Sequence, residues 1–432
     1  MIRNRTLAAL FGLCSGLVAC EDTSRHPTEP DLGPVAADPQ AAVTRYAATR
    51  LSIRSGLATD VNNQGQVVGY HSAAQGTRAF LWSNGTFRNL GTLGGVYSRA
   101  RAINEAGQVV GQSGTAAGPG HAFLWQNGTM QDLGTLGATS SIAIGIDANG
   151  RVLGFTGDAS GPRAFIWENG QMKRLTGLGP GYIPTGFDNQ GRVVGVYDDE
   201  GSPRAFRWVA GTVTDLGTLG GTMARASATV GGKIVGWSTR ADGAQRAFVW
   251  ENGTMKGLGA LGGVGSSSAS AINSLGHIVG WSQKPDSAPR AFVWKDGVMS
   301  PVAVGVAEDI NKAGWVVGSG SIPFPVLWQP TTDPPPPGNS ITVGTSYFLS
   351  DRNWTTDPAV DTVAVGTTVT WTWVTGPAVS HSVQSVGSPS FTSSELTGGV
   401  GVTHSFKFTQ PGTYLYNCRA HPGNMFGRVV VK

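Results

Sequence analysis

The chain has 432 residues, which is enough for more than one domain and for a sizeable core. Only 13% of the residues are charged, and a net charge of +4 without a long basic run gives no case for nucleic acid as a partner. The 64 glycines, with abundant valine, alanine and threonine, are typical of many short strands joined by tight turns.

Residues 1–20 have the pattern of an export signal. Arg3 and Arg5 precede the apolar stretch TLAALFGLCSGLVA, which has the length of a signal-peptide core and is too short to span a membrane comfortably. The stretch ends in LVAC, which resembles the lipobox of bacterial lipoproteins. The resemblance implies that Cys20 receives lipid and anchors an extracytoplasmic protein to a bacterial membrane. The alternative is an ordinary cleaved signal with an incidental cysteine.

Residues 21–41 are polar and proline-rich, and they predict a flexible tether. Glu21 after the lipidated cysteine favours an outer-membrane or surface location, by resemblance to known sorting patterns. Of the three cysteines, Cys14 would leave with the signal and Cys20 would carry lipid, so Cys418 becomes the only thiol of the mature protein. Such a cysteine in an exported protein is intermolecular, reactive, a metal ligand, or buried and inert.

Residues 42–328 repeat one unit. The segment RAFLWSNGTFRNLGTLGG (78–95) returns as RAFVWENGTMKGLGALGG (246–263), and a second signature such as DVNNQGQVVG lies between these segments. Each unit predicts about four short strands, because AFLW alternates and Asn-Gly is a strong hairpin signal. The anchoring tryptophan of the unit recurs at Trp82, Trp125, Trp167, Trp208, Trp250, Trp294 and Trp328.

A period of about forty residues with four strands per unit is typical of propeller blades. The chain here resembles the HAF-repeat family of bacterial extracellular proteins, named for the motif seen as His121-Ala122-Phe123. That family is defined by its repeats and implies no chemistry. The seven anchors predict seven blades, with the segment VTRYAATRLSIRSG (43–56) completing the last unit and joining the ring. An open two-sheet or solenoid stack is the alternative.

Motifs within the repeats are interpreted as turns. GLGALG (257–262) fits a nucleotide-binding pattern, but neither it nor its copies open a helix. DANG and DNQG lack the carboxylates of a calcium loop. No residue type recurs in a way that indicates a catalytic centre, so the propeller is expected to be no enzyme, and its ligand is not readable from the sequence.

Residues 329–340 are a proline-rich linker, and residues 341–432 have longer segments that alternate in period two. These segments predict a β-sandwich of about ninety residues. They read SITVGTSYF, DTVAVGTTVTWTWV, SHSVQSV, THSFKFTQPGTYLYN and GRVVVK.

Four possible metal ligands lie in this last segment. Cys418 ends one strand segment and Met425 precedes the next, with His421 in the short loop between them and His381 in a strand segment upstream. Two imidazoles, a thiolate and a thioether form the ligand set of a blue-copper electron-transfer centre. A structural zinc site is disfavoured because it would use histidine or cysteine as its fourth ligand. His404 has no metal spacing.

Residues 341–432 resemble the cupredoxins, the family of plastocyanin, amicyanin and azurin. The resemblance implies a Greek-key β-sandwich in which His381, Cys418, His421 and Met425 bind one type 1 copper ion. The loop HPGNM is one residue shorter than that of plastocyanin and one longer than that of amicyanin, which affects the bond of Met425 most. In the family the exposed edge of the imidazole matching His421 passes electrons, and Pro422 and Phe426 lie near it in sequence.

The sequence therefore predicts an all-β protein, a β-propeller of seven blades followed by a cupredoxin. The expected function is one-electron transfer to an unidentified redox partner protein, with the copper domain held away from the lipid by the tether and the propeller. No substrate is transformed. The alternative is an adhesion or ligand-binding protein, whose propeller takes a protein or glycan and whose copper domain is auxiliary. A multicopper oxidase or copper nitrite reductase is disfavoured, because these need further copper centres built from histidine pairs, and the chain has no His-x-His pair and only seven histidines.

Overall fold

A computed structural model of the chain provides the structure. The signal segment, the tether, Cys20 and His421 lie outside the described residues. Within the part of the chain that is described, no helix is long and apolar enough to cross a membrane. The described residues are 45–51, 55–159, 161–263, 265–284, 288–320, 325–331, 340–343, 348–350, 359–373, 380–399, 401–420 and 425–432.

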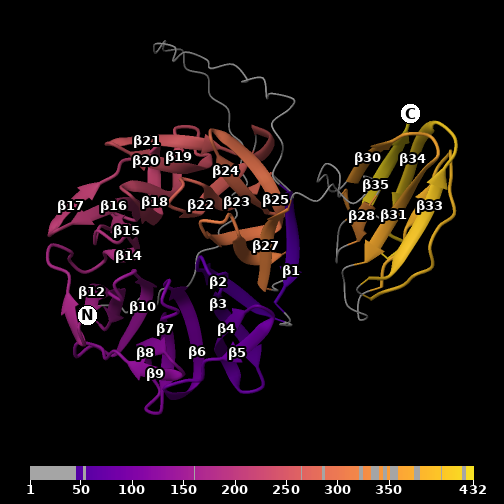
Figure 1. The fold of residues 1–432 in the computed structure, drawn as a ribbon. Coiled ribbons are helices and arrows are strands. Elements are labelled where there is room, and N and C mark those ends of the chain that lie inside the picture. The colour runs from indigo at the N-terminus through magenta and orange to yellow at the C-terminus, as the bar shows by residue number, and fades with distance from the viewer. Residues whose placement is uncertain are drawn as a thin grey trace, which may run out of the picture. The chain divides into compact units, whose positions relative to one another are not determined.

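The repeat region is all-β and propeller-like, with antiparallel sheets that follow one another around a common centre (Figure 1). Five sheets have four strands each, in chain order. They are β2 (Gly56–Val61), β3 (Val67–Ala73), β4 (Gly76–Ser83) and β5 (Thr86–Asn89); β6 (Gly94–Ile103), β7 (Val109–Thr115), β8 (Gly120–Gln126) and β9 (Thr129–Asp132); β10 (Ser140–Ile146), β11 (Val152–Gly157), β12 (Arg163–Glu168) and β13 (Gln171–Arg174); β14 (Ile183–Phe187), β15 (Val193–Asp199), β16 (Ser202–Val209) and β17 (Thr212–Asp215); and β18 (Gly220–Val230), β19 (Lys233–Arg240), β20 (Gln245–Glu251) and β21 (Thr254–Gly259).

A sixth sheet of seven strands follows a short 3-10 turn, η1 (Leu261–Gly263). Its long strand β25 pairs with β24 through residues 298–304 and with β26 through residues 305–310, so this sheet consists of two units joined end to end. The sheet order is β1 (Arg45–Arg50), β27 (Pro325–Thr331), β26 (Val316–Gly320), β25 (Val298–Ile310), β24 (Arg290–Lys295), β23 (Ile278–Gln283) and β22 (Ser266–Ile272).

The N-terminal strand β1 completes the last unit, as the sequence predicted. It pairs antiparallel with β27, with Arg45 opposite Thr331 and Arg50 opposite Val326. Strand β27 thus continues past residue 328, where the repeat region was expected to end. The first and last units also meet directly, because Asn311 Nδ2 donates a hydrogen bond to Asn62 O at 3.0 Å.

The Asn/Asp-x-x-Gly segments form the expected turns and also link neighbouring units. In the first unit, Gly65 N donates to Asn62 O at 3.0 Å, which closes the turn, and the buried Asn62 Nδ2 donates to Asn104 O of the next unit at 3.1 Å. Where aspartate replaces asparagine the donor changes: Arg151 bonds to Asp147 Oδ2 through Nε at 2.7 Å and donates through Nη2 to Asn189 O at 2.9 Å. Buried polar groups are thereby satisfied between units.

Each innermost strand carries a β-bulge opposite a glycine. In the first unit the pairing with β3 shifts between Ala58 and Asp60, and a Cβ at Gly69 would overlap the carbonyl oxygen of Leu57. A bulge re-aims one side chain, here that of Thr59. The matching glycines of the other units, also too close to a carbonyl oxygen for a Cβ, are Gly111, Gly154, Gly195, Gly236, Gly280 and Gly318.

The described residues between 340 and 432 form two four-stranded sheets whose inner faces share one hydrophobic core. The fully buried Trp371 and Trp373 come from one sheet and Tyr416 from the other, in agreement with the predicted β-sandwich. One sheet has the order β29 (Phe348–Ser350), β28 (Ser340–Val343), β31 (Thr367–Trp373) and β33 (Thr403–Phe408), and the other β30 (Ala359–Val363), β35 (Phe426–Val431), β34 (Gly412–Asn417) and β32 (Gln384–Val386).

Two carboxyl groups meet where the ring closes. Asp60 accepts hydrogen bonds from Val61 N at 2.8 Å and from Ile103 N at 2.7 Å, while Asp309 accepts a second bond from Val61 N at 3.1 Å. Burial, and then the neighbouring Asp309 carboxylate, raise the pKa of Asp60 well above its usual range. The folded protein therefore retains a proton on Asp60 at pH values where the unfolded chain has lost it.

Replacing Asp60 by asparagine is expected to stabilise the protein at neutral and alkaline pH. The amide oxygen would still accept from Ile103 N and the amide nitrogen would donate to Asp309, while Val61 N keeps its bond to Asp309 Oδ2. The wild type, in contrast, must take up a proton on folding and loses up to about 1.4 kcal/mol of stability per pH unit above the ordinary carboxyl range. Urea unfolding between pH 4 and pH 9 measures the difference, which should shrink towards pH 4. The control Asp296→Asn, at an exposed turn with φ of 50°, should leave the pH dependence of stability unchanged. If the stability of Asp60→Asn depended on pH in the same way as that of the wild type, the proton retained on Asp60 would be contradicted.

Candidate metal centre

Cys418 and Met425 lie at the two ends of one inter-strand connection. Strands β34 and β35 are antiparallel with Asn417 opposite Phe426, so Cys418 directly follows one strand and Met425 directly precedes the other. Cys418 N donates to Met425 O at 3.0 Å, which continues the ladder by one more bond. The strand ends predicted from the sequence are confirmed, and they bring both sulfur-containing residues to the same end of the sandwich.

His381 reaches this end of the sandwich from the neighbouring segment. It forms an isolated antiparallel bridge with Thr397, in which His381 N donates to Thr397 O at 2.7 Å and Thr397 N to His381 O at 2.9 Å. The expected strand is shorter than the sequence indicated, since β32 begins only at Gln384, opposite Asn417 of β34. This pairing sets His381 beside the residue that follows β34.

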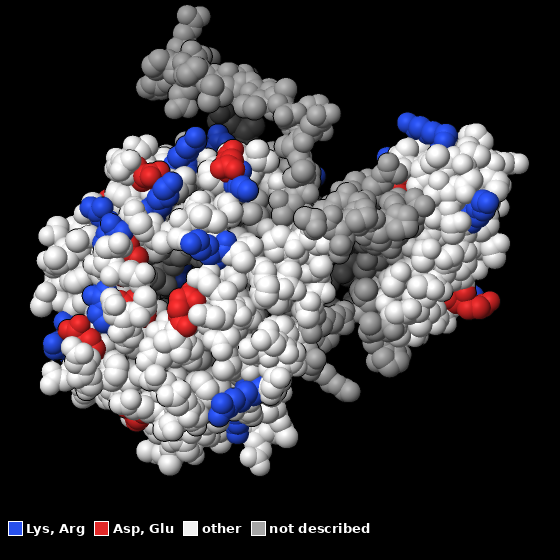
Figure 2. All heavy atoms as spheres, viewed as in Figure 1, with Lys and Arg blue, Asp and Glu red and all other residues white. Residues whose placement is uncertain are grey.

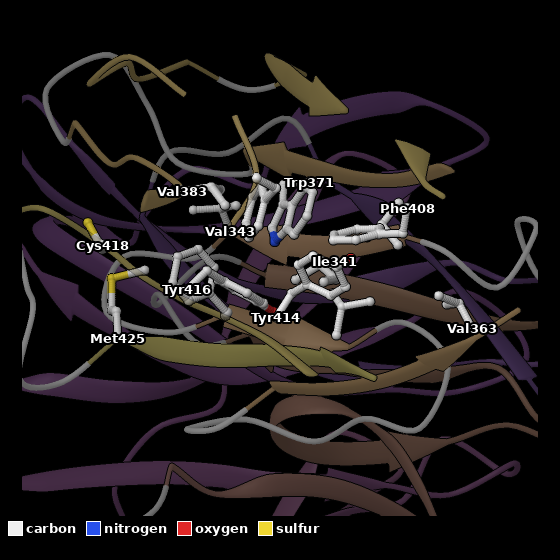
Figure 3. Packing of buried hydrophobic residues seen from close by; sticks show 14 of the residues in the cluster. Ile341, Val343, Val363, Trp371, Val383, Phe408, Tyr414, Tyr416, Cys418 and Met425 are labelled. Carbon is white, nitrogen blue, oxygen red and sulfur yellow. The ribbon is translucent and has the colours of Figure 1, made fainter. Parts of the chain in front are cut away.

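The donor atoms of His381 and Cys418 face each other. His381 Nδ1 lies 3.6 Å from Cys418 Sγ, and both residues have 0% of their surface exposed. Met425 is also fully buried, and both sulfur-containing side chains belong to the sandwich core. Figure 3 shows Cys418 and Met425 at the same end of that core, beside Tyr416.

The separation of these atoms fits a shared metal ion. An imidazole nitrogen at about 2.0 Å and a thiolate at about 2.3 Å from one ion, at tetrahedral to trigonal angles, lie about 3.6 Å apart. No cluster of three or more His, Cys, Asp or Glu side chains able to hold a metal occurs among the described residues. The predicted set needs His421 as its third strong ligand, and His421 lies in the segment 421–424 outside those residues.

Ser382 holds the two ligand-bearing segments together. Its Oγ accepts a hydrogen bond from Arg419 N at 3.0 Å, which joins the residue after His381 to the residue after Cys418, and the serine is fully buried. Sequence reasoning missed Ser382, because a serine in SHSV has no spacing that marks it. Only its position next to a predicted ligand could have drawn notice.

The remaining histidine of the domain is engaged elsewhere. His404 lies on β33, where its Nε2 is 2.9 Å from Thr392 O and its ring is 5.8 Å from that of Trp371. The expectation that His404 is no ligand agrees with this placement. Aromatic contacts continue behind the centre, since Tyr416 packs edge-on against Trp371 at 5.3 Å and against Phe348 at 4.9 Å.

The C-terminal domain is thus a β-sandwich with a buried pair of possible metal ligands at one end. Residues 355–432 match the family of copper binding proteins, plastocyanin/azurin family. The C-terminal domain thus resembles the copper-binding domains of plastocyanin/azurin type. The match concerns these residues alone and not the chain before them.

Solved structures similar to this chain include cupredoxins and a TolB protein. A purple cupredoxin from Nitrosopumilus maritimus is 27% identical, over 22% of this chain and 98% of that chain, with a TM-score of 0.17. The oxidized form of an amicyanin mutant is 26% identical, over 22% of this chain and 82% of that chain, with a TM-score of 0.18. TolB from Acinetobacter baumannii is 12% identical, over 61% of this chain and 79% of that chain, with a TM-score of 0.39.

Replacing Cys418 by serine is expected to abolish the intense thiolate-to-copper absorption of the Cu(II)-loaded protein, because the sulfur ligand is lost. The visible spectrum of the loaded protein measures this. His404→Gln is the matched control and should keep the colour, since His404 bonds to Thr392 O. Retained colour in Cys418→Ser would show that Cys418 is no ligand.

Proposed function

We propose that the protein is a membrane-anchored, extracytoplasmic blue copper protein that transfers single electrons through one type 1 copper centre. The observation that carries the proposal is the buried pair of His381 Nδ1 and Cys418 Sγ at 3.6 Å, within a domain of plastocyanin/azurin type. His381, Cys418 and His421 would hold the ion, with Met425 as the weak axial ligand. The redox partner is a protein that the sequence does not identify.

The ion, when bound, would supply a one-electron change between Cu(II) and Cu(I). Cys418 and Met425 offer soft sulfur donors that suit Cu(I), and the imidazoles suit Cu(II) as well. The main-chain bridge of His381 to Thr397 and the bond of Arg419 N to Ser382 Oγ fix the donors within the core. Burial of the described donors keeps water from them, so little has to rearrange when the charge changes.

The repeat region supports a second candidate function. We infer a closed propeller of seven blades, made of the five four-stranded sheets and the two units that share β25. Its HAF-type repeats offer no catalytic group, so a ligand-binding or adhesive role, with a protein or glycan as ligand, is the alternative to electron transfer. The copper domain would then be auxiliary, and no reaction would be catalysed.

The test of electron transfer is the visible and EPR spectrum of the Cu(II)-loaded full chain. An intense blue band that bleaches on ascorbate and returns on reoxidation is the expected result. A colourless protein, or a band that does not return, would overturn the function and would leave the propeller as the working part.

Replacing Met425 by leucine is expected to leave a coloured site with a raised reduction potential, because a weak electron-donating axial ligand is lost. Leucine is close to methionine in volume, so the buried position should tolerate it. Voltammetry of the loaded protein measures the potential, and an unchanged melting temperature of the apo-protein is the control. A potential equal to that of the wild type would mean that Met425 is not the axial ligand.

Replacing Cys20 by alanine is expected to release the protein from membranes, since the lipid attachment site is lost. Fractionation of a bacterial host that expresses the full chain, with Cys14→Ala as the matched control, measures this. A variant that still fractionates with the membrane would contradict the lipid anchor.

A further inference from the structure

A cavity of about 730 Å³ lies at the centre of the ring. Residues of the innermost strand of every unit line it, from β2, β6, β10, β14, β18, β22 and β25. Its volume is in the range of sites for small organic molecules. In Figure 2 charged side chains of both signs lie around the middle of the ring.

The lining differs between units although the units repeat. The bulge of each innermost strand sends one residue into the cavity, and the glycine opposite the bulge is kept in every unit. The inward residues nevertheless differ in size and charge. They are Thr59, Arg101, Ile144, Thr185, Ser227, Ser270 and Glu308. The bulge that points a side chain inward is thus the same in every unit, while the chemistry of that side chain varies. The lining therefore has no rotational symmetry, because its inward charged, polar and apolar residues come from different units.

Arg225 is one of two arginines that line the cavity, together with the carboxyl groups of Asp60, Glu308 and Asp309. Its side chain is exposed, and among the described residues it makes no hydrogen bond, ion pair or ring contact. The other arginines nearby are compensated: Arg99 lies 5.3 Å from the ring of Tyr70, and Arg101 acts on the carboxylate of Glu308. A guanidinium without such a partner favours an oxyanion, above all a carboxylate that it can bind through two hydrogen bonds.

Apolar surface adjoins this guanidinium. Trp237 is the direct cross-strand partner of Arg225 and also lines the cavity. Two further sheets present the same kind of cross-strand pair with apolar members, Ile142 with Phe155 and Leu57 with Tyr70. An anionic head group and an apolar body therefore match Arg225 and the apolar residues beside it.

We propose that the cavity binds a small organic carboxylate with an apolar or aromatic body. The carboxylate bonds to the guanidinium of Arg225, and the body packs against Trp237 and Phe155. This site is independent of the metal centre, so either can fail without the other.

The experiment uses the full chain and calorimetric titration with 3-phenylpropionate, indole-3-acetate and octanoate. Each is paired with its neutral amide, and acetate tests the head group alone. The carboxylates should bind, with the amides and acetate at least about tenfold weaker, because charge-assisted bonds and apolar burial are both needed. Arg225→Gln should cost about tenfold or more in affinity, and Trp237→Leu should weaken binding of the aromatic acids more than that of octanoate.

Two controls keep the test decisive. Lys256→Gln on the exposed face of β21 should leave binding unchanged. Arg101→Gln tests the other arginine of the lining, whose charge Glu308 offsets, and should cost less affinity than Arg225→Gln. Unchanged melting temperatures of the variants show that they fold. The proposal is overturned if none of the three acids binds, if the amides bind as well as the acids, or if Arg101→Gln abolishes binding while Arg225→Gln does not.

Discussion

Closure of the ring is the constraint on which the repeat region depends. Each sheet buries its faces only against its neighbours, so the first and last units would expose theirs if they did not meet. The bond from Asn311 to Asn62 O and the Asp309 carboxylate on Val61 N join these two units. The same kind of bond links interior units, which makes closure one more copy of the ordinary contact. The central cavity depends on the contact between the first and last units.

The candidate metal centre likewise depends on a few local contacts. Its described donors come from two segments, and the short bonds that tie those segments together are made by the backbone and by Ser382 rather than by the donors. The positions of His381 Nδ1 and Cys418 Sγ are therefore set by the sheet register and the core. A rigid site follows from this, which would suit the proposed electron transfer because the ligands need not rearrange when the charge changes.

The repeat period predicted more of the fold than any single motif did. The tryptophan anchors and Asn-Gly turns located the units, and the incomplete last unit pointed to β1, because hydrogen-bonding strands must find a partner. Cys418 and Met425 could be placed at strand ends for the same reason. The bulges, the links made by Asn62 and the role of Ser382 could not be predicted, because they depend on which carbonyl of a distant strand lies nearby. The contact of His381 with Thr397 is likewise tertiary, and it replaced an expected strand with a single bridge.

The pairing of β1 with β27 also fixes where the chain enters and leaves the ring. Arg45, where the chain enters, lies opposite Thr331, where it leaves, on neighbouring strands of one unit. The whole repeat region therefore adds almost no length to the path between the preceding tether and the following linker. If the N-terminus carries the proposed lipid anchor, the reach of the C-terminal domain would depend on the lengths of the predicted tether and linker more than on the repeat region. Deleting the ring cleanly would shorten that reach very little, whereas shortening the tether would reduce it directly.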